Sequence, residues 1–244
     1  MINKKLTNDD KVKRVEIIVL KYNRPDCEKE CVNAIIEHTS HPYKLNLYDN
    51  RLNSANMSKI WNKLIRESTC EYVLVMDSDA FPQHDRWLEM LVECFEMYPK
   101  CGYAVPVIGQ SGGPKVQQHE LSGAHPERIN GHASGFCFLT KKSIVEDMGW
   151  FDEDFYIFGQ DSDFLERVMR ESEYEIYVAR RSFVKHGHLI NENKHSGLEE
   201  VWEFSNSTRK ASEAGEFVWK LDTTFCSHLL DSKYKNYYDK GKKG

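Results

Sequence analysis

The sequence YVLVMDSD, residues 72–79, determines how the rest of the chain is interpreted. Its first five residues form an apolar run of the kind found in a strand that is covered on both faces. Asp77, Ser78 and Asp79 follow directly, at the carboxyl end of that strand. Side chains two residues apart in an extended segment point to the same side. Such a pair of carboxylates can hold a hard divalent cation such as Mn²⁺ or Mg²⁺. The alternative is a turn with two helix-capping aspartates.

Strand and helix patterns alternate on the amino-terminal side of this stretch. Residues 15–20 are a β-branched run typical of a strand, and residues 26–38 repeat apolar side chains at helical spacing. A second strand is expected at 45–48 and a second helix at 57–65. Together with the strand at 72–76 this gives the order β-α-β-α-β, which predicts a mainly parallel sheet covered by helices. Ligands of such sheets bind beyond the carboxyl ends of the strands.

On the carboxyl-terminal side, a helix is expected at 87–95 and a strand at 103–107. Residues 109–135 are rich in Gly, Pro, His and Gln and show no regular period. A segment of that length between strong elements is typical of a functional loop, so we expect it to cover the site. Regular patterns then resume, with strands expected at 136–140 and 176–179 and helices at 141–148 and 162–171.

These patterns predict an α/β protein with one Rossmann-like, mainly parallel sheet flanked by helices, followed by a mixed carboxyl-terminal part. We divide the chain into a polar extension at 1–14, two halves of one domain at 15–108 and 109–190, and a helical and basic region at 191–244. Residues 232–244 hold five Lys against one Asp, with three Tyr between them. A tail of this composition is expected to be solvated and mobile.

The 244 residues carry 33 Lys and Arg against 38 Asp and Glu, so the formal net charge is −5. With 40% hydrophobic and 29% charged residues, the composition is that of a folded globular protein. The acidic balance argues against a broad nucleic-acid-binding surface. The sequence has no run of about 18 apolar residues, so no membrane span is predicted. The polar residues 1–14 lack a signal-peptide pattern. We therefore expect a cytoplasmic protein whose seven cysteines are free thiols.

Three stretches of the chain carry a resemblance to a known enzyme family. They are VEIIVLKYNRPDC at 15–27, VLVMDSDAFPQHDRWL at 73–88 and GWFDEDFYIFGQDSDFLERV at 149–168. Their order and spacing resemble those of a family 2 glycosyltransferase with the GT-A fold, over residues 15–188. In that family the first three strands end in a Tyr-Asn-Arg loop, an Asp-Asn pair and an Asp-x-Asp motif. The matching positions here are Tyr22, Asn23 and Arg24, then Asp49 and Asn50, then Asp77 and Asp79.

The resemblance implies that residues 15–108 bind a nucleoside diphosphate sugar, with UDP as the expected carrier. Tyr22 would stack on the base and Asp49 would accept an N–H of the base edge. Asp77 would contact the ribose or the metal, and Asp79 would bind the metal. From residue chemistry alone, Tyr22 could instead be a loop aromatic and Asp49 a turn cap. The donor-binding residues implied in this way are Tyr22, Asn23, Arg24, Asp49, Asp77 and Ser78.

The resemblance also implies a general base in the acceptor half, residues 109–190. The family has a Glu-Asp-x-Asp stretch in which a carboxylate takes the proton of the acceptor hydroxyl. The matching stretch here is GQDSD, and it gives that role to Asp161. Gln160 replaces the usual acidic residue, so the assignment of the base stays open. Judged by residue type alone, Asp161 and Asp163 equally suit the first turn of a helix.

His186 follows the last expected strand, in the sequence KHGH at 185–188. A histidine at this place resembles the family's third metal ligand, beside Asp77 and Asp79, or a contact to the diphosphate. A neutral imidazole suits Mn²⁺. His188 could be a surface residue. The function implied is a metal-dependent hexosyl- or pentosyltransferase. Inversion at the sugar is expected because no second, nucleophilic carboxylate is identifiable.

The acceptor is expected to be a saccharide or another hydroxyl compound. The Lys- and Tyr-rich residues 232–244 also allow a hydroxyl-bearing nucleic-acid base as the acceptor. A nucleotidyltransferase is a further alternative, although residues 21–26 lack the glycine-rich phosphate loop that such an enzyme would more often have. Gln160 supports the last alternative, a non-catalytic module that binds nucleotide-sugars.

Overall fold

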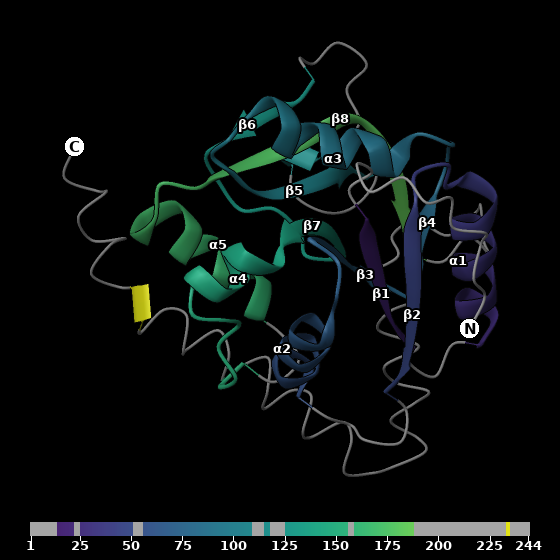
Figure 1. The fold of residues 1–244 in the computed structure, drawn as a ribbon, viewed down its shortest axis with the longest axis horizontal. Coiled ribbons are helices and arrows are strands. Elements are labelled where there is room, and N and C mark those ends of the chain that lie inside the picture. The colour runs from purple at the N-terminus through teal and green to yellow at the C-terminus, as the bar shows by residue number, and fades with distance from the viewer. Residues whose placement is uncertain are drawn as a thin grey trace.

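The computed structural model describes residues 14–21, 25–50, 56–108, 115–117, 125–155, 159–187 and 233–234. These residues form an eight-stranded sheet with the order β2-β1-β3-β7-β5-β8-β4, and β6 pairs with β8 outside that path (Figure 1). The strands are β1 (Val15–Lys21), β2 (Tyr43–Asp49), β3 (Tyr72–Asp77), β4 (Ala80–Pro82), β5 (Cys101–Val107), β6 (Glu127–Ile129), β7 (Cys137–Lys141) and β8 (Glu175–His186). The helices are α1 (Pro25–His38), α2 (Met57–Glu67), α3 (Trp87–Met97), α4 (Lys142–Asp147) and α5 (Gln160–Glu171), with a 3-10 turn, η1, at Lys115–Gln117.

The first three long strands are parallel and end at the same edge of the sheet. β1 lies between β2 and β3, with Lys21 opposite Asp49 on one side and Leu20 opposite Asp77 on the other. The β-α-β-α-β order expected from the sequence is therefore confirmed. It places the carboxyl ends of β2 and β3 on either side of the end of β1, where this class of sheet binds its ligands.

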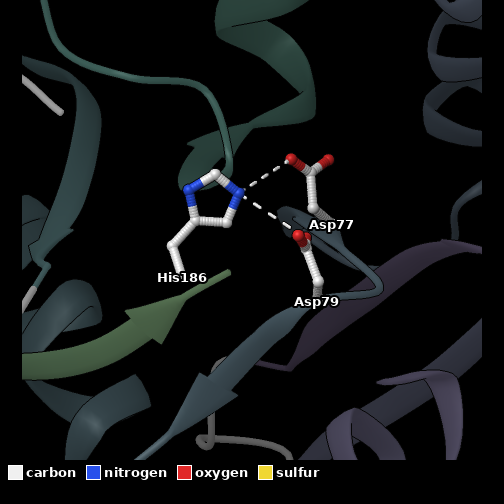
Figure 2. A group of neighbouring side chains, drawn as sticks. All are labelled: Asp77, Asp79 and His186. Atoms are coloured by element: carbon white, nitrogen blue, oxygen red, sulfur yellow. Dashed lines mark ion pairs between the residues drawn. The ribbon is translucent and has the colours of Figure 1, made fainter. Parts of the chain in front are cut away.

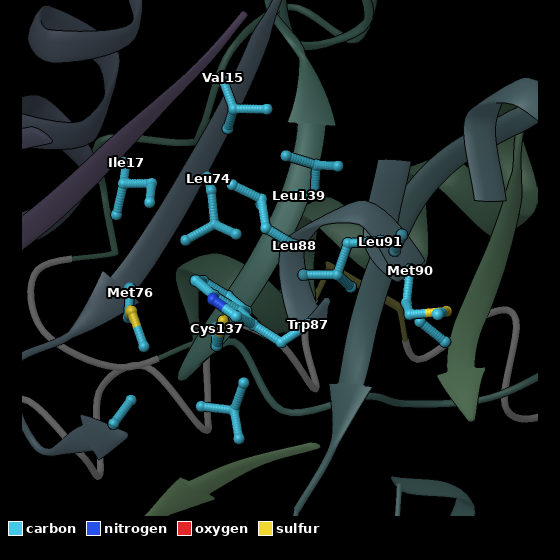
Figure 3. Close-up of a cluster of buried hydrophobic side chains, with 14 of the residues drawn as sticks. Val15, Ile17, Leu74, Met76, Trp87, Leu88, Met90, Leu91, Cys137 and Leu139 are labelled. Carbon is cyan, nitrogen blue, oxygen red and sulfur yellow. The ribbon is translucent and has the colours of Figure 1, made fainter. Parts of the chain in front are cut away.

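The central strands are covered on both faces, as their unbroken apolar runs predict. Ile17 and Leu74 face α1 and α3, in a cluster that also contains Trp87 (Figure 3). Ile18 and Val73 point the other way and pack with residues of α2 and α5. Burying one aliphatic side chain completely contributes about 1.5–3 kcal/mol. Two apolar layers thus hold the strand ends that carry the polar residues.

The prediction of an α/β fold with a mainly parallel sheet flanked by helices is confirmed, and the observed sheet is mixed. β5 and β8 form a second parallel pair. β7 runs antiparallel to both β3 and β5 and joins the two parallel groups into one sheet. The short strands β4 and β6 also pair antiparallel, on β8.

Two predicted segments differ from the structure. The last strand was expected to end at residue 179, but β8 continues to His186 because its second half pairs with β4. Within the segment 109–135, β6 pairs with β8, so this segment is not wholly irregular. Residues 109–114 and 118–124 lie outside the described part, and the prediction that the segment covers the site stays a prediction.

The thiols expected in the core are buried and free at six described positions. No helix in the described part of the chain is long and apolar enough to span a membrane. Most of the carboxyl-terminal tail lies outside the described residues, but the expectation of a solvated tail is wrong for Tyr234, whose exposed fraction is 1%. The six free cysteines are Cys27, Cys31, Cys70, Cys94, Cys101 and Cys137.

Candidate metal centre and base

Two acidic residues at the carboxyl end of β3 lie next to a histidine at the end of β8. Asp77 is the last residue of β3, and Asp79 precedes β4 after a tight turn. Because β4 and β8 pair antiparallel with Ala80 opposite His186, the histidine is brought next to this turn. The N–H of Gly187 donates to the carbonyl of Asp79 at 3.0 Å and holds the two segments together. Strand pairing thus builds the cluster.

The three side chains converge on one point (Figure 2). Nε2 of His186 lies 3.6 Å from Oδ2 of Asp77 and 3.5 Å from Oδ1 of Asp79. One ligand atom from each residue lies within 4.8 Å of the other two, which no other trio of His, Cys, Asp and Glu in the described part of the chain achieves. Two carboxylates and an imidazole are a donor set that suits Mn²⁺, and Mg²⁺ through the oxygens. The residues present therefore fit a divalent cation.

The negative charges of the cluster favour the binding of a cation. Burial raises the pKa of Asp77, and the charges of Asp79 and Asp161 raise it further, while His186 opposes them. Burial lowers the pKa of His186, but hydrogen bonds and charge from Asp77 and Asp79 outweigh that effect and raise it to about 10. Without a metal ion, the protonated imidazole is the counterion of both carboxylates. A metal ion would replace that proton.

The residues just before β7 connect this cluster to α5. The N–H of Asp77 donates to the carbonyl of Phe136 at 2.8 Å. The ring of Phe136 stacks on the imidazole of His186, with centroids 4.4 Å apart and an interplanar angle of 19°. One residue earlier, the N–H of Gly135 donates to Oδ2 of Asp161 at 2.8 Å. Gly135 and Phe136 therefore link the metal-ligand candidates to the base candidate.

Asp161 occupies the first turn of α5 at this same site. The helix starts after Gly159, whose φ of 85° is in the left-handed region that favours glycine. Burial is the main cause that raises the pKa of Asp77 and that of Tyr103, and the charge of Asp161 raises both further. The hydrogen bond to Gly135, the neighbour of Phe136, places Asp161 near the cluster. A carboxylate held by one N–H beside a metal-ligand trio has the chemistry expected of a general base.

Asp161 and Asp163 have different environments in the structure, a difference that the sequence did not predict. Asp163 is fully buried and its carboxylate is saturated by Arg167, Lys233 and Tyr234, so it has no path to a substrate. Gln160 is 5% exposed, and its Oε1 has no hydrogen-bond partner in the described part of the protein. Of the two acidic residues, Asp161 alone borders the metal cluster.

Some of the remaining donor-site residues expected from the sequence lie at the same edge of the sheet, and the others fall outside the described residues. Asp49 ends β2 opposite Lys21, and Ser78 is buried in the turn after β3. The N–H of Asn50 donates to the carbonyl of Lys21 at 3.1 Å. Tyr22, Asn23 and Arg24 fall outside the described residues, and so does His188.

Sequence reasoning missed Gly135, Phe136 and Tyr103. Gly135 precedes the predicted strand at 136–140 and Phe136 begins it, and a Gly-aromatic pair at the start of a strand is too common a pattern to mark a site. Tyr103 lay inside the predicted strand at 103–107, which suggested a packing role only. Its ring does stack on Phe138, with centroids 4.6 Å apart, but its hydroxyl has no partner among the described atoms.

Several solved structures share this fold. One is GalNAc-T7 with UDP, GalNAc and Mn²⁺ (TM-score 0.58, 12% identity), and it is matched over 73% of this chain and 44% of its own. Another is S. aureus TarS 1-349 (0.56, 15%, 71% and 60%). A third is the mannosyltransferase PcManGT from Pyrobaculum calidifontis with GDP-Man and Mn²⁺ (0.54, 14%, 76% and 59%). The chain thus spans less than two thirds of each of these proteins, and at such identities the likeness establishes the fold, that of GT-A glycosyltransferases.

No curated protein sequence matches the chain. The model of glycosyl transferase family 2 matches residues 4–155, more than half of the chain. That range includes the Asp-x-Asp turn and the Gly135–Phe136 link. The chain therefore belongs to glycosyl transferase family 2.

Proposed function

We propose that the protein is a metal-dependent, inverting glycosyltransferase that moves a hexosyl or pentosyl group from a nucleoside diphosphate sugar to an acceptor hydroxyl. The observation that carries this proposal is the convergence of Asp77, Asp79 and His186 beside Asp161. A cation site and a candidate base on one sheet edge are what direct transfer from a nucleotide-sugar requires. In this proposal residues 15–108 bind the donor and residues 109–190 bind the acceptor.

Asp77, Asp79 and His186 would hold Mn²⁺ or Mg²⁺. When bound, such an ion neutralises the negative charge that develops on a departing diphosphate. Asp49, the last residue of β2 at the same edge of the sheet, would accept an N–H of the base, which favours UDP as the carrier. Tyr22, Asn23, Arg24 and Ser78 complete the proposed donor site. Two structures with this fold contain UDP or GDP-Man together with Mn²⁺, which supports a nucleotide-sugar donor.

Asp161 would take the proton of the acceptor hydroxyl. As that oxygen attacks the anomeric carbon, the bond from this carbon to the diphosphate oxygen breaks, and the electron pair leaves with the nucleoside diphosphate. The N–H of Gly135 orients Oδ2 of Asp161 and leaves Oδ1 for the proton. A single displacement of this kind inverts the configuration of the sugar.

A saccharide or another hydroxyl compound is the acceptor class that we propose. The alternative of a nucleic-acid base rested on the Lys- and Tyr-rich tail. Of that tail, Lys233 and Tyr234 are the described residues, and the polar groups of both bind the carboxylate of Asp163. No observation on this chain favours the nucleic-acid acceptor over a saccharide.

The test is a screen of nucleotide-sugars with Mn²⁺, Mg²⁺ and chelator, read as release of nucleoside diphosphate. We expect release that requires a divalent ion and that is lost in Asp79→Asn. Binding of nucleotide-sugar without release in any condition would leave a non-catalytic module. Release of pyrophosphate from nucleoside triphosphates would indicate a nucleotidyltransferase. A product that retains the donor's anomeric configuration would contradict single displacement with Asp161 as base.

A further inference from the structure

The carboxylate of Asp163 is buried without any exposed surface, and four polar atoms of other side chains contact it. Nε and one terminal nitrogen of Arg167 lie 2.9 Å from its Oδ2. On the other oxygen, Oδ1, Nζ of Lys233 lies at 2.6 Å and the hydroxyl of Tyr234 at 2.7 Å. A charge in the interior needs such partners, because its lost hydration is otherwise uncompensated. Two of these four contacts come from a distant segment of the chain.

Lys233 and Tyr234 bind more than one part of the fold. Nζ of Lys233 also lies 2.7 Å from Oδ2 of Asp152, in the segment between α4 and α5. Tyr234 is 1% exposed, and its hydroxyl also lies 3.2 Å from the carbonyl of Asp163. We call Lys233 and Tyr234 the C-terminal clamp. Through Asp152 and Asp163 it joins the start of α5 to the segment that precedes it.

The charges of this group balance. Asp152 and Asp163 carry two negative charges, and Arg167 and Lys233 carry two positive charges. Burial lowers the pKa of Lys233, but hydrogen bonds to the two carboxylates outweigh this effect and raise it. Burial and the bond to Asp163 raise the pKa of Tyr234, so its hydroxyl keeps the proton that it donates. The clamp is therefore fully formed at neutral pH.

The start of α5 depends on these contacts. Its N-cap residue is Gly159, which has no side chain to cap the helix. The N–H of Asp163 donates to the carbonyl of Gly159 at 2.8 Å, which closes the first turn. Asp161 is in that turn and meets Gly135 on the side of the metal cluster. No side chain caps the helix, and the contacts of Asp163 with Lys233 and Tyr234 fix its first turn instead.

We propose that Lys233 and Tyr234 are positioning residues for the transfer reaction, because they hold the first turn of α5 and with it Asp161. This inference rests on the proposed role of Asp161 as base. It assigns no chemistry to the clamp itself: neither residue touches the metal cluster. Lys233 lies 70 residues further along the chain than the carboxylate of Asp163 that it binds.

The experiment uses full-length Lys233→Met and Tyr234→Phe variants. We expect kcat to fall about ten- to a hundredfold, since a small misplacement of a reacting group has effects of that order, while the KM for the donor changes less than about twofold. Lys233→Arg, which keeps the charge, should restore most of the rate. Matched controls are Lys100→Met and Tyr174→Phe, which remove bonds from surface pairs with Glu173 and Asp147. Both controls should keep the wild-type kcat.

Amide hydrogen exchange of the ligand-free proteins gives a readout that needs no activity. Faster exchange at 159–163 and at 135 in the clamp variants, with 72–77 unchanged, would support the proposal. Unchanged exchange at 159–163, or a normal kcat with only a lower melting temperature, would overturn it. If the wild-type protein transfers no sugar, the proposed function fails, and exchange alone still decides whether the clamp holds the start of α5.

Discussion

Gly135 donates its backbone N–H to Oδ2 of Asp161 at 2.8 Å, and the two residues pack without room for another carbon atom. A Cβ added at Gly135 would lie 2.6 Å from Cβ of Asp161 and 2.7 Å from its Oδ2. The clash involves the root of the side chain, which a rotamer change cannot move. The glycine therefore sets how closely β7 and α5 approach at the candidate base.

Gly135→Ala should displace Asp161 and destabilise the protein, by about 1–3 kcal/mol as for other overpacked sites. We expect kcat to fall more than tenfold, because the base candidate moves with α5. Thermal unfolding and steady-state kinetics measure the two effects. Gly131→Ala is the matched control, since a Cβ at Gly131 meets no atom within 4 Å. Equal kcat in the two variants would contradict the assignment of Asp161.

Asp161→Asn should keep the shape of the side chain and remove its ability to take a proton. We expect kcat to fall about 10²- to 10⁴-fold, the usual contribution of general-base catalysis. Binding of the nucleoside diphosphate with Mn²⁺, measured by calorimetry, should change little. A variant that retains more than a tenth of the wild-type kcat would indicate that another group takes the proton.

Asp163→Asn should act on stability. The buried carboxylate balances Arg167 and Lys233, so its neutral amide leaves these cations under-compensated. Breaking a buried ion pair by changing one partner typically costs about 3–5 kcal/mol. Denaturant unfolding would measure the loss. Glu173→Gln, which removes a partner of the exposed Lys100, is the control and should change stability by less than about 1 kcal/mol. A loss that small at Asp163 would argue against a charged network there.

Metal affinity should rise with pH because of His186. In the metal-free protein its pKa is raised from 6.5 to about 10, so at neutral pH the imidazole carries a proton that a metal ion must displace. We expect affinity for Mn²⁺ to rise by up to about tenfold per pH unit below that pKa, as one bound proton requires. His186→Asn should bind more weakly and lose most of this dependence. Calorimetry at pH 6.5, 7.5 and 8.5 would test both statements.

The same shift has the opposite sign for the stability of the metal-free protein. Because folding raises the pKa of His186, its protonated imidazole stabilises the folded protein. This contribution is complete below the unfolded pKa of 6.5 and is lost as the pH rises through about 10. Wild-type protein in chelator should therefore lose stability relative to His186→Asn across that range. Parallel stability profiles of the two proteins would mean that the imidazole does not pair with Asp77 and Asp79.

Local patterns predicted much of the framework. The apolar run before Asp77 predicted a strand covered on both faces, and the alternation of strands and helices predicted parallel pairing of the first three strands. These features follow from residue-level sterics and burial, which act over a few residues. For the same reason the sequence predicts Asp49, Asp77 and Asp79 at the carboxyl edge of the sheet.

The contacts between these residues and the rest of the site could be identified only from the tertiary structure. His186 reaches Asp79 because β8 extends to pair with β4, and the polar start of that extension hid its strand character. Asp161 and Asp163 have the same local sequence signal, and only packing turns one toward Gly135 and buries the other.

The sequence by itself determined the fold class, the family resemblance and the acidic end of β3, because each depends on short-range patterns. The tertiary structure alone decided which aspartate of α5 borders the metal cluster and which residues hold that helix in place. Lys233 and Tyr234 show why: the composition of their segment indicated a solvated tail. Both residues bind a buried carboxylate far away in the chain, and no local pattern records such a partner.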